Sequence, residues 1–440
     1  MKRKLLMSGL AMLAGLSLGA CAGGGGGSSG TTALETNQTE PNQAASVAET
    51  SSVTGDGELE GTYEIEFFHC KPEDFELYET LIAKFHESYP NIKVTQTCPS
   101  EPNKAFVTRV ASNDMPDLAG VTVLSSQIVE MMDEGIFIPL DDQVFLSRAN
   151  DASVAQLYRE DGHIYAMPIT INGFGVYYNL DYFEQVGADV PVTLDEFINV
   201  CEKLKTAGIQ PIVFCDKDPT KLPQQVDRLY IGSADHSPWD KYDKILSGEY
   251  SMIDDKALRA TAEAYLKIRE YGQSDTLATS GDQAISDFAM GNAAMMIDGT
   301  WSANAYAKQN PDLNYSCFIF PAITDVEACN AGAYDTGYVV PEGTGNEAAA
   351  LKFIDFLTGE DIAQEFCDGD MNLNVLKSVN YGVEVLKQIN DATFTLSGST
   401  EWSSAFRSDQ AVLFQKLFMD KDVDSFLREY DALVINYYSE

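Results

Sequence analysis

The stretch YEIEFFHCKPEDFELYETLIAKFHESYPNIKVTQT, residues 63–97, gives the clearest indication of the fold class. Its two ends, 63–69 and 92–97, are rich in the β-branched and aromatic residues that favour strands. Its centre, 73–88, places apolar side chains such as Leu81 and Phe85 at helical spacing. Pro90 indicates a turn between the helix and the second strand. A strand, a helix and a strand in this order predict a β-α-β unit.

The alternation of strand and helix continues outward from this unit. Strands are expected at 118–123, 176–180 and 212–214, separated by helices that end at Gly135 and Gly208. Thr193 and Glu196 form a capping box at the start of the second of these helices. We expect later helices at 255–271, 283–290, 346–358 and 360–367, strands near 294–297, 315–320 and 336–340, and a mainly helical end from 380. The pattern predicts an α/β fold, and a length of 440 residues suits two domains.

Composition and motif content argue against several functions. The chain has 29 Lys and Arg against 67 Asp and Glu, so its net charge of -38 opposes binding to nucleic acid or anionic lipid. Eight cysteines without a CxxC pair and four scattered histidines predict no zinc site. The HExxH motif is absent, and no local motif singles out a pair of catalytic carboxylates. We therefore expect neither a metal, nor a cofactor, nor catalysis.

The first sixty residues have the pattern of an exported, anchored protein. MKRKLLMSGLAMLAGLSLGAC, 1–21, has a basic start, an apolar stretch too short for a membrane span, and small residues before a cysteine. Its end, Leu18-Gly19-Ala20-Cys21, resembles the bacterial lipobox, which implies cleavage after 20 and lipidation of the Cys21 thiol. Residues 22–60 are mainly Gly, Ser, Thr and other polar types. A segment of this composition cannot bury enough apolar surface to offset the conformational entropy that it would lose on folding. We expect a signal peptide at 1–20 and a lipidated, flexible tether at 21–60.

If Cys21 carries a lipid, seven cysteines remain, which cannot all be paired. Cys70 and Cys98 follow two strands expected to be parallel neighbours. The two cysteines either form a disulfide or stay as unpaired thiols. The sequence leaves both alternatives open, because the distance and orientation of the side chains decide between them.

Five stretches in order resemble the family 1 extracellular solute-binding proteins, the carbohydrate-binding, maltose-binding-protein-like components of ATP-driven importers. These are KFHESYPNIKVT, MPDLAGVTV with EGIFIPLDD, DGHIYAMPITINGFGVYYNLDYFEQVGADVPVTLDEF, FAMGNAAMMIDGTW and AGAYDTGYVVPEGTGNEAAALKFIDFLTGED, which together span about 63–375. The resemblance implies a two-lobe, type II periplasmic-binding-protein-like fold. It assigns 61–168 with 332–371 to the first lobe, and 169–331 with 372–440, including the C-terminal helices, to the second.

The resemblance also implies three hinge crossings, near 168–173, 332–337 and 372–376, and a ligand in the cleft between the lobes. Sugars present apolar faces and a rim of hydroxyls, so aromatic plates, carboxylates and amides are suitable contacts. Trp301 in DGTW matches the Gly-x-Trp motif of the family, Trp239 lies in the polar loop ADHSPWDKY, and Trp402 follows the third crossing. A core position for Trp301 is the alternative.

The remaining candidate contacts lie at the expected strand ends and crossings. They are Asp298, Asp335, His69, Thr122, Asn172, Asn372, Phe174 and Tyr338. Asp and Asn at turns often serve as backbone caps, and His69 could equally be a histidine satisfied within the end of the sheet.

We therefore expect a monomeric lipoprotein on the extracellular face of the cell membrane. It would bind a carbohydrate, and in particular an oligosaccharide, by closure of the cleft and pass it to the permease subunits of an ABC importer. Two alternatives stay open. One is a binder of another solute, such as a polyamine or a peptide, and the other is a glycoside-processing enzyme.

Overall fold

The computed structural model describes residues 59–219, 221–234, 239–396 and 403–438, all within the compact unit Ser51–Glu440. The predicted signal peptide, Cys21 and nearly all of the predicted tether lie outside these ranges. No helix in the described ranges combines the length and the apolar character needed to cross a membrane.

The β-α-β unit predicted from 63–97 opens the first lobe. Strand β1 (Tyr63–His69) is parallel to β2 (Ile92–Thr97), with Ile65 opposite Val94, and helix α1 (Phe75–Ser88) joins them. The sheet has the order β2-β1-β3-β11-β4, where the other strands are β3 (Leu118–Thr122), β11 (Thr336–Val339) and β4 (Met167–Pro168). Strand β3 is parallel to β1, whereas β11 runs antiparallel to β3 and β4, so the sheet is mixed rather than wholly parallel.

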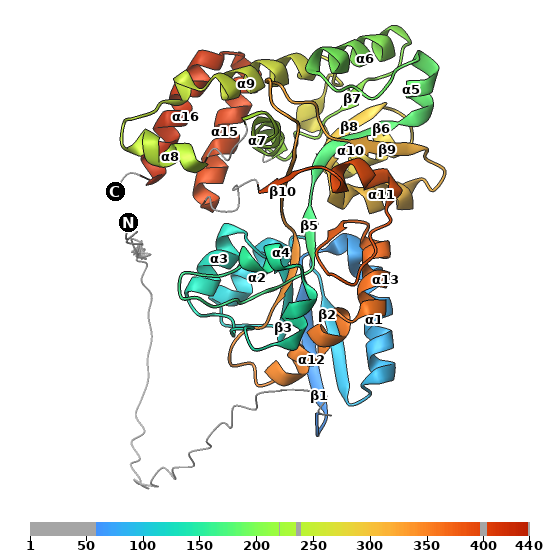
Figure 1. Cartoon of the computed structure of the whole chain (residues 1–440), viewed down its shortest axis with the longest axis vertical. Helices are drawn as coiled ribbons and strands as arrows, with labels where there is room; N and C mark the ends of the chain where they lie inside the picture. Colours follow the sequence, from blue (N-terminus) through green and yellow to red (C-terminus); the bar gives the residue numbers. More distant parts are fainter. Residues whose placement is uncertain (1–58, 220, 235–238, 397–402, 439–440) are drawn as a thin grey trace, which may run out of the picture. The chain divides into compact units, whose positions relative to one another are not determined.

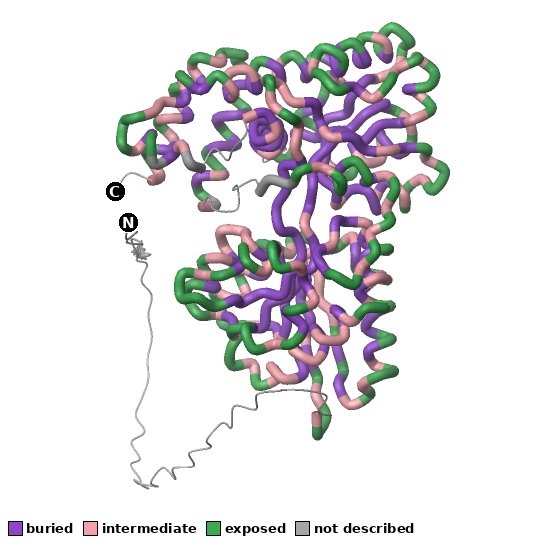
Figure 2. Tube along the Cα trace, in the orientation of Figure 1, coloured by how far each residue is buried: buried purple, intermediate pink, exposed green. Residues whose placement is uncertain are grey.

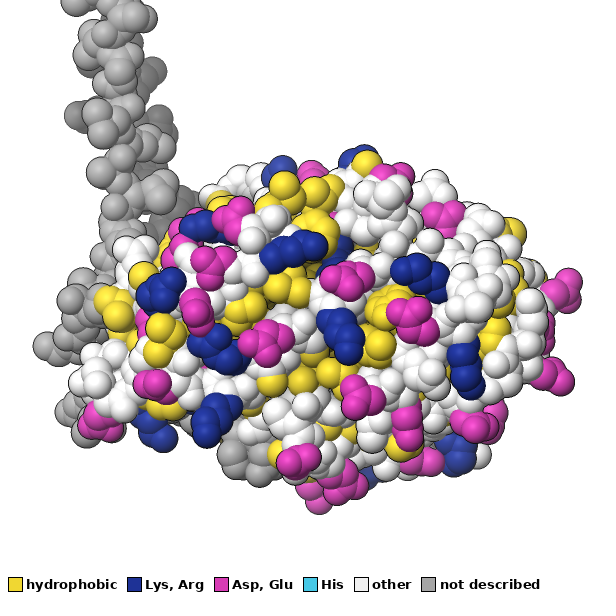
Figure 3. All heavy atoms as spheres, turned by 90° about the horizontal axis from the view of Figure 1, so that it is seen from above, with side chains coloured by type: hydrophobic (Ala, Val, Ile, Leu, Met, Phe, Trp, Pro, Cys, Tyr) yellow, Lys and Arg dark blue, Asp and Glu magenta, His cyan; other side chains and the backbone are white. Residues whose placement is uncertain are grey.

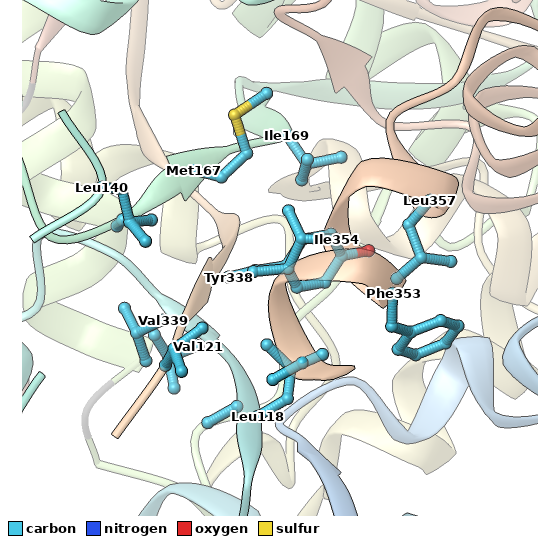
Figure 4. Close-up of a cluster of buried hydrophobic side chains, with 14 of the residues drawn as sticks. Leu118, Val121, Leu140, Met167, Ile169, Tyr338, Val339, Phe353, Ile354 and Leu357 are labelled. Carbon is cyan, nitrogen blue, oxygen red and sulfur yellow. The ribbon is translucent and has the colours of Figure 1, made fainter. Parts of the chain in front are cut away.

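Helices enclose this sheet and complete its core. They are α2 (Pro102–Ala111), α3 (Ser126–Asp133), α4 (Asp151–Ala155), α12 (Glu347–Leu357) and α13 (Glu360–Asp370). Figure 4 shows how α12 packs on the sheet: Phe353, Ile354 and Leu357 gather with Leu118 of β3 and Tyr338 of β11. Residues more than two hundred positions apart in the sequence thus share one core, because β11 and α12 pack against strands from the first hundred residues of the folded part.

The second lobe has its own sheet, in the order β7-β8-β6-β9. Its strands are β7 (Ile212–Val213), β8 (Met295–Gly299), β6 (Phe174–Asn179) and β9 (Tyr315–Phe318). Its helices are α5 (Leu180–Val186), α6 (Leu194–Thr206), α7 (Lys221–Ala234), α8 (Trp239–Leu246), α9 (Lys256–Arg269), α10 (Gly281–Ala289), α11 (Ala303–Gln309), α14 (Lys387–Asn390), α15 (Ser404–Asp420) and α16 (Val423–Tyr438). The predicted Thr193–Glu196 capping box is present at the start of α6 and is therefore confirmed.

A small third sheet, of order β12-β5-β10-β13, lies between the two lobes (Figure 1). It consists of β12 (Leu373–Asn374), β5 (Thr170–Asn172), β10 (Asn330–Tyr334) and β13 (Phe394–Leu396). Strand β5 pairs antiparallel with β10 on one side and with β12 on the other. The three segments that pass between the lobes are therefore hydrogen-bonded to one another, so a movement of one is transmitted to the others.

Burial follows the division into two lobes. Figure 2 shows buried chain along the strands of each lobe and exposed chain along the outer faces of the helices. One apolar cluster contains buried residues from the segments 65–169 and 334–376, and another contains buried residues from 174–320 and 406–434. Val375 and Leu376 belong to the first cluster, so the chain contacts the first core once more after β12. The predicted two-lobe α/β fold class is confirmed.

Figure 3 views the protein from the end that is uppermost in Figure 1, where α5, α6 and α9 lie. Acidic and basic side chains are interspersed on this face and separated by apolar and neutral ones. The view shows no basic patch of the kind that would attract a phosphate backbone.

Candidate functional site

An open pocket of about 180 Å³ combines residues of both lobes. First-lobe and crossing segments supply most of its lining, and the 3-10 helix η5 (Thr300–Ser302), which follows β8 of the second lobe, supplies Trp301. The lining residues are Cys70, Lys71, Glu73, Asn103, Gly120, Val121, Thr122, Trp301, Asp335 and Thr336. Three of the candidates named from the sequence, Thr122, Trp301 and Asp335, thus meet at one site.

Trp301 is held by the shape of the turn that carries it. A Cβ atom at Gly299 would lie 2.1 Å from Cη2 and Cζ3 of the indole, so the ring occupies the space that a side chain would need. Lys221 Nζ lies 5.6 Å from the centroid of the ring. Trp301 is half-buried and packs against the second core, which leaves part of its ring at the pocket. A fixed, partly exposed indole can offer an apolar plate to a ligand.

The part of the pocket wall outside the second lobe contains a buried ion pair between Lys71 and Asp335. Lys71 follows β1, and Asp335 lies between β10 and β11. Glu73 Oε1 lies 3.3 Å from Lys71 Nζ. Burial by itself favours the neutral amine, but the surrounding carboxyl groups, Asp335 foremost, outweigh it and raise the pKa of Lys71 well above its ordinary value. Lys71 is therefore charged, and one Asp335 oxygen is committed to it.

Asn372 connects this wall to the second lobe. Its Nδ2 donates to Asp335 Oδ2 at 2.7 Å, and its Oδ1 accepts from the hydroxyl of Thr300. Thr300 Oγ1 also accepts from the backbone N–H of Gly173 at 2.9 Å. We call Lys71, Asp335, Asn372 and Thr300 the interlobe network. It joins the first lobe, two crossings and the turn of Trp301 by consecutive hydrogen bonds.

Two carboxyl groups lie close to Lys71, within the first lobe. Asp74 and Asp370 are both buried and lie next to each other. Burial raises the pKa of Asp74 well above its ordinary value, and the nearby Asp370 adds to the effect. Burial also raises the pKa of Asp370, to about 6, against the opposing charge of Lys71. Lys71 therefore faces a group of carboxyls that hold protons more tightly than exposed ones do.

Two aromatic candidates of the first lobe lie in its core rather than at the pocket. His69 is buried, with its ring centroid 5.3 Å from that of Phe67 and 4.7 Å from that of Tyr78. Its Nε2 is 3.0 Å from Gln96 Oε1, and burial lowers its pKa, which favours the neutral ring. Tyr338 is 1% exposed, and its hydroxyl is 3.1 Å from that of Tyr78. Since both side chains take the core side of the sheet, neither lines the pocket.

Three other candidates do not line the pocket. Asp298 accepts from the Ser302 hydroxyl at 2.7 Å and from the Gly299 N–H at 2.8 Å, so it fixes the turn of Trp301. Asn172 accepts from the Ala333 N–H at 3.0 Å and ties β5 to β10. Phe174 is buried in the second core.

The two remaining tryptophans cannot be placed at the pocket. Trp239 begins α8, but its side chain lies outside the described residues. Trp402 lies outside the described residues altogether.

Sequence reasoning missed Lys71, Glu73, Asn103 and Thr336. Lys71 and Glu73 come within four residues of the end of β1, at the same edge of the sheet that led us to His69. The rule that ligands bind beyond the carboxyl ends of strands would have found them if it had been applied to the loop rather than to the last strand residue. In the described part of the chain, no group of three or more His, Cys, Asp or Glu is arranged to hold a metal.

Comparison with known proteins places this geometry in context. A sequence model of the family described as bacterial extracellular solute-binding protein matches residues 71–364. A multiple sugar-binding protein of Streptococcus mutans is 26% identical over 320 residues, which cover 72% of this chain and 76% of that protein. An arabinooligosaccharide-binding protein of Halalkalibacterium halodurans is 24% identical over 333 residues, 72% of each chain.

Solved structures show the same fold. A solute-binding protein, RafE, in complex with raffinose superposes with a TM-score of 0.76 at 22% identity, covering 84% of this chain and 98% of that one. The apo form of RafE from Streptococcus pneumoniae gives a TM-score of 0.72 at 22% identity, over 87% and 98% of the two chains.

Proposed function

The chain belongs to the bacterial extracellular solute-binding protein family, and we propose that its solute is a carbohydrate, which it delivers to an ABC-type importer. The observation that carries this proposal is the meeting of Trp301 from one lobe with Thr122, Lys71 and Asp335 on one pocket. An indole suits the apolar face of a sugar ring, and charged groups form strong hydrogen bonds with its hydroxyls.

The named relatives support the same class of ligand. The Streptococcus mutans relative is a multiple sugar-binding protein, and the Halalkalibacterium relative binds arabinooligosaccharide. The pocket volume of about 180 Å³ is below the roughly 300–1,000 Å³ of common ligand sites, so it suits one sugar unit of an oligosaccharide. Further units would extend from its open side.

Binding would couple to the positions of the lobes. A sugar that contacts Trp301 and the Lys71–Asp335 wall together stabilises the arrangement in which both are in reach. The interlobe network runs through Asn372 in a crossing segment, so a change at the pocket reaches the small sheet between the lobes. The permease subunits would recognise the protein in that arrangement, and the sugar increases the fraction of molecules that adopt it.

The remaining parts of the proposal concern location. Lipidation of Cys21 would anchor the protein at the extracellular face of the membrane, and residues 21–60 would act as the tether. A monomer on such a tether stays close to a permease in the same membrane. We propose no catalytic role.

A calorimetric panel tests the ligand class. Purified protein is titrated with mono- and oligosaccharides, a polyamine and a short peptide, and incubated separately with the oligosaccharides to look for cleavage products. We expect heat and saturable binding with at least one oligosaccharide, and no cleavage. Binding of the polyamine or the peptide alone, or release of shorter glycans, would contradict the proposal.

A further inference from the structure

Cys70 and Cys98 lie at the carboxyl ends of two neighbouring parallel strands, β1 and β2. The register of these strands ends with Phe68 opposite Thr97, so Cys98 follows beside His69, and Cys70 lies one residue further along. If the pairing continued one residue beyond each strand, an inter-strand spacing of about 4.8 Å and a rise of about 3.3 Å per residue would put the two Cα atoms about 6 Å apart. That separation lies within the range of roughly 4.4–6.8 Å that disulfides span.

Local contacts hold both cysteines at this position. The backbone N–H of Cys70 donates to the Gly120 carbonyl of β3 at 3.0 Å. The backbone N–H of Lys71, the next residue, hydrogen-bonds to the side chain of Cys98. The sulfur of Cys98 therefore lies against the backbone directly after Cys70.

Both thiols are within reach of small molecules. Cys70 and Cys98 are half-buried, and Cys70 lines the open pocket. Burial, followed by the neighbouring Cys98, raises the pKa of Cys70 to about 12, and burial raises the pKa of Cys98 to about 11. Both are therefore protonated thiols at neutral pH, and Cys98 ionises more readily.

The other cysteines of the described residues have different surroundings. Cys201, Cys215, Cys317 and Cys367 are buried. Cys329 is half-buried like Cys70, but its sulfur faces the backbone oxygen of Ile231 at 3.9 Å. Cys329 therefore serves as a matched control of similar exposure.

We infer that Cys70 and Cys98 form an oxidation site, in which a low-molecular-weight disulfide such as oxidised glutathione converts the two thiols into an intramolecular disulfide. The Cys98 thiolate attacks the oxidant, breaks its S–S bond and releases one glutathione thiol. Cys70, after loss of its proton, then attacks the Cys98 sulfur and releases the second glutathione. Two cysteine thiols are oxidised, and the two sulfurs of the oxidant are reduced and protonated.

The bridge would join the loop that carries Lys71 and Glu73 to the end of β2. It closes the segment 70–98, which contains α1, and so restricts the unfolded chain. We expect the oxidised protein to melt about 5 °C higher than the reduced protein. Because the high pKa values limit the thiolate fraction, formation should be faster at pH 9 than at pH 7.

Peptide mapping tests this inference in the absence of any solute. The purified protein is incubated with oxidised glutathione, alkylated, digested without reduction and analysed by mass spectrometry. We expect one linked species that joins the Cys70 and Cys98 peptides, with the loss of two hydrogens. If wild-type Cys70 and Cys98 instead remain alkylated, or end as separate glutathione adducts, the inference is overturned.

Three variants refine the same experiment. In Cys70→Ser, Cys98 should retain glutathione, because no second thiol is present to release it. In Cys98→Ser the linked species should be absent, and the increase in melting temperature on oxidation should be lost. Cys329→Ser should form the link as the wild type does. Loss of the link in Cys329→Ser, or an unchanged increase in melting temperature in Cys98→Ser, would count against the site.

Discussion

The two walls of the pocket are built on different principles. On the first-lobe wall, Lys71 and Asp335 are buried charges that neutralise each other, and Asn372 adds a hydrogen bond to the pair. On the second-lobe wall, the Trp301 ring is held by shape, over a glycine and within a turn fixed by Asp298. A change on the charged wall should therefore alter both folding and binding, whereas a change on the aromatic wall should alter binding alone.

The largest expected effect is the loss of the only cation in the interlobe network. Lys71→Met removes the cation that is paired with Asp335 and close to Asp74 and Asp370, so we expect a loss of about 3–5 kcal/mol in the free energy of unfolding. Denaturant titration measures it. Lys71→Met combined with Asp335→Asn should regain part of the loss. A single variant as stable as the wild type would show that the ion pair does not stabilise this wall.

The charged wall should also make stability depend on pH. The pKa of Asp370 is about 6 in the folded protein, above the ordinary aspartate value of 3.8. Between these values the folded state holds more protons than the unfolded state, so stability is highest below pH 4 for this group and falls as the pH rises through 6. The contribution of Asp370 to the free energy of unfolding changes by at most about 1.4 kcal/mol per pH unit.

Asp370→Asn should flatten this dependence, as followed by denaturant midpoints from pH 4 to pH 7. Asp368→Asn is a matched control, because Asp368 lies on the same helix and is exposed. Lys71, Asp74, Glu73 and Asp335 surround the carboxyl and stay unchanged in both variants. Equal pH profiles for the two variants would contradict the assignment.

On the aromatic wall, Trp301→Ala should weaken sugar binding about 30-fold, which corresponds to roughly 2 kcal/mol. The melting temperature should change far less than in Lys71→Met, because Trp301 is only half-buried. Calorimetry with the best-binding oligosaccharide measures the affinity. Trp301→Phe, which keeps an aromatic ring, should retain part of it. Wild-type affinity in Trp301→Ala would remove the ring from the proposed site.

The smallest effect is expected from the residue beneath the ring. Gly299→Ala places a Cβ 2.1 Å from ring atoms of Trp301, so the ring must shift, and we expect about tenfold weaker binding. Gly281→Ala is the control, since a Cβ there meets no atom within 4 Å. Adding Gly299→Ala to Trp301→Ala should cost no further affinity, because the two changes act on one ring. Additive losses would show that Gly299 acts by another route.

The fold and the family could be predicted from local patterns. The strand, helix and strand of 63–97, the capping box at Thr193 and the five motif stretches all depend on residues close in sequence, and the structure and the family match confirm them. The mixed direction of the first sheet was not predicted, because β11 joins β3 from more than two hundred residues away. Periodicity reports a strand but not its partner.

The candidate site was less accessible to such reasoning, and its ligand contacts stay predictions. His69 and Tyr338 were selected for their places near strand ends and crossings, yet their side chains point into the first core. Lys71 was not predicted to lie at the site, because nothing in the neighbouring sequence distinguishes it from other lysines in loops. Its role depends on Asp335, a residue 264 positions away.

The alternation of strands and helices, the family and the aromatic residue of the Gly-x-Trp turn could be read from the amino-acid sequence, because these depend on spacing along the chain. Which side chains share the pocket, and that Lys71 is a buried cation paired with Asp335, became clear from the three-dimensional structure alone. Burial and charge pairing depend on segments that meet in space, and a linear pattern does not specify which of them meet.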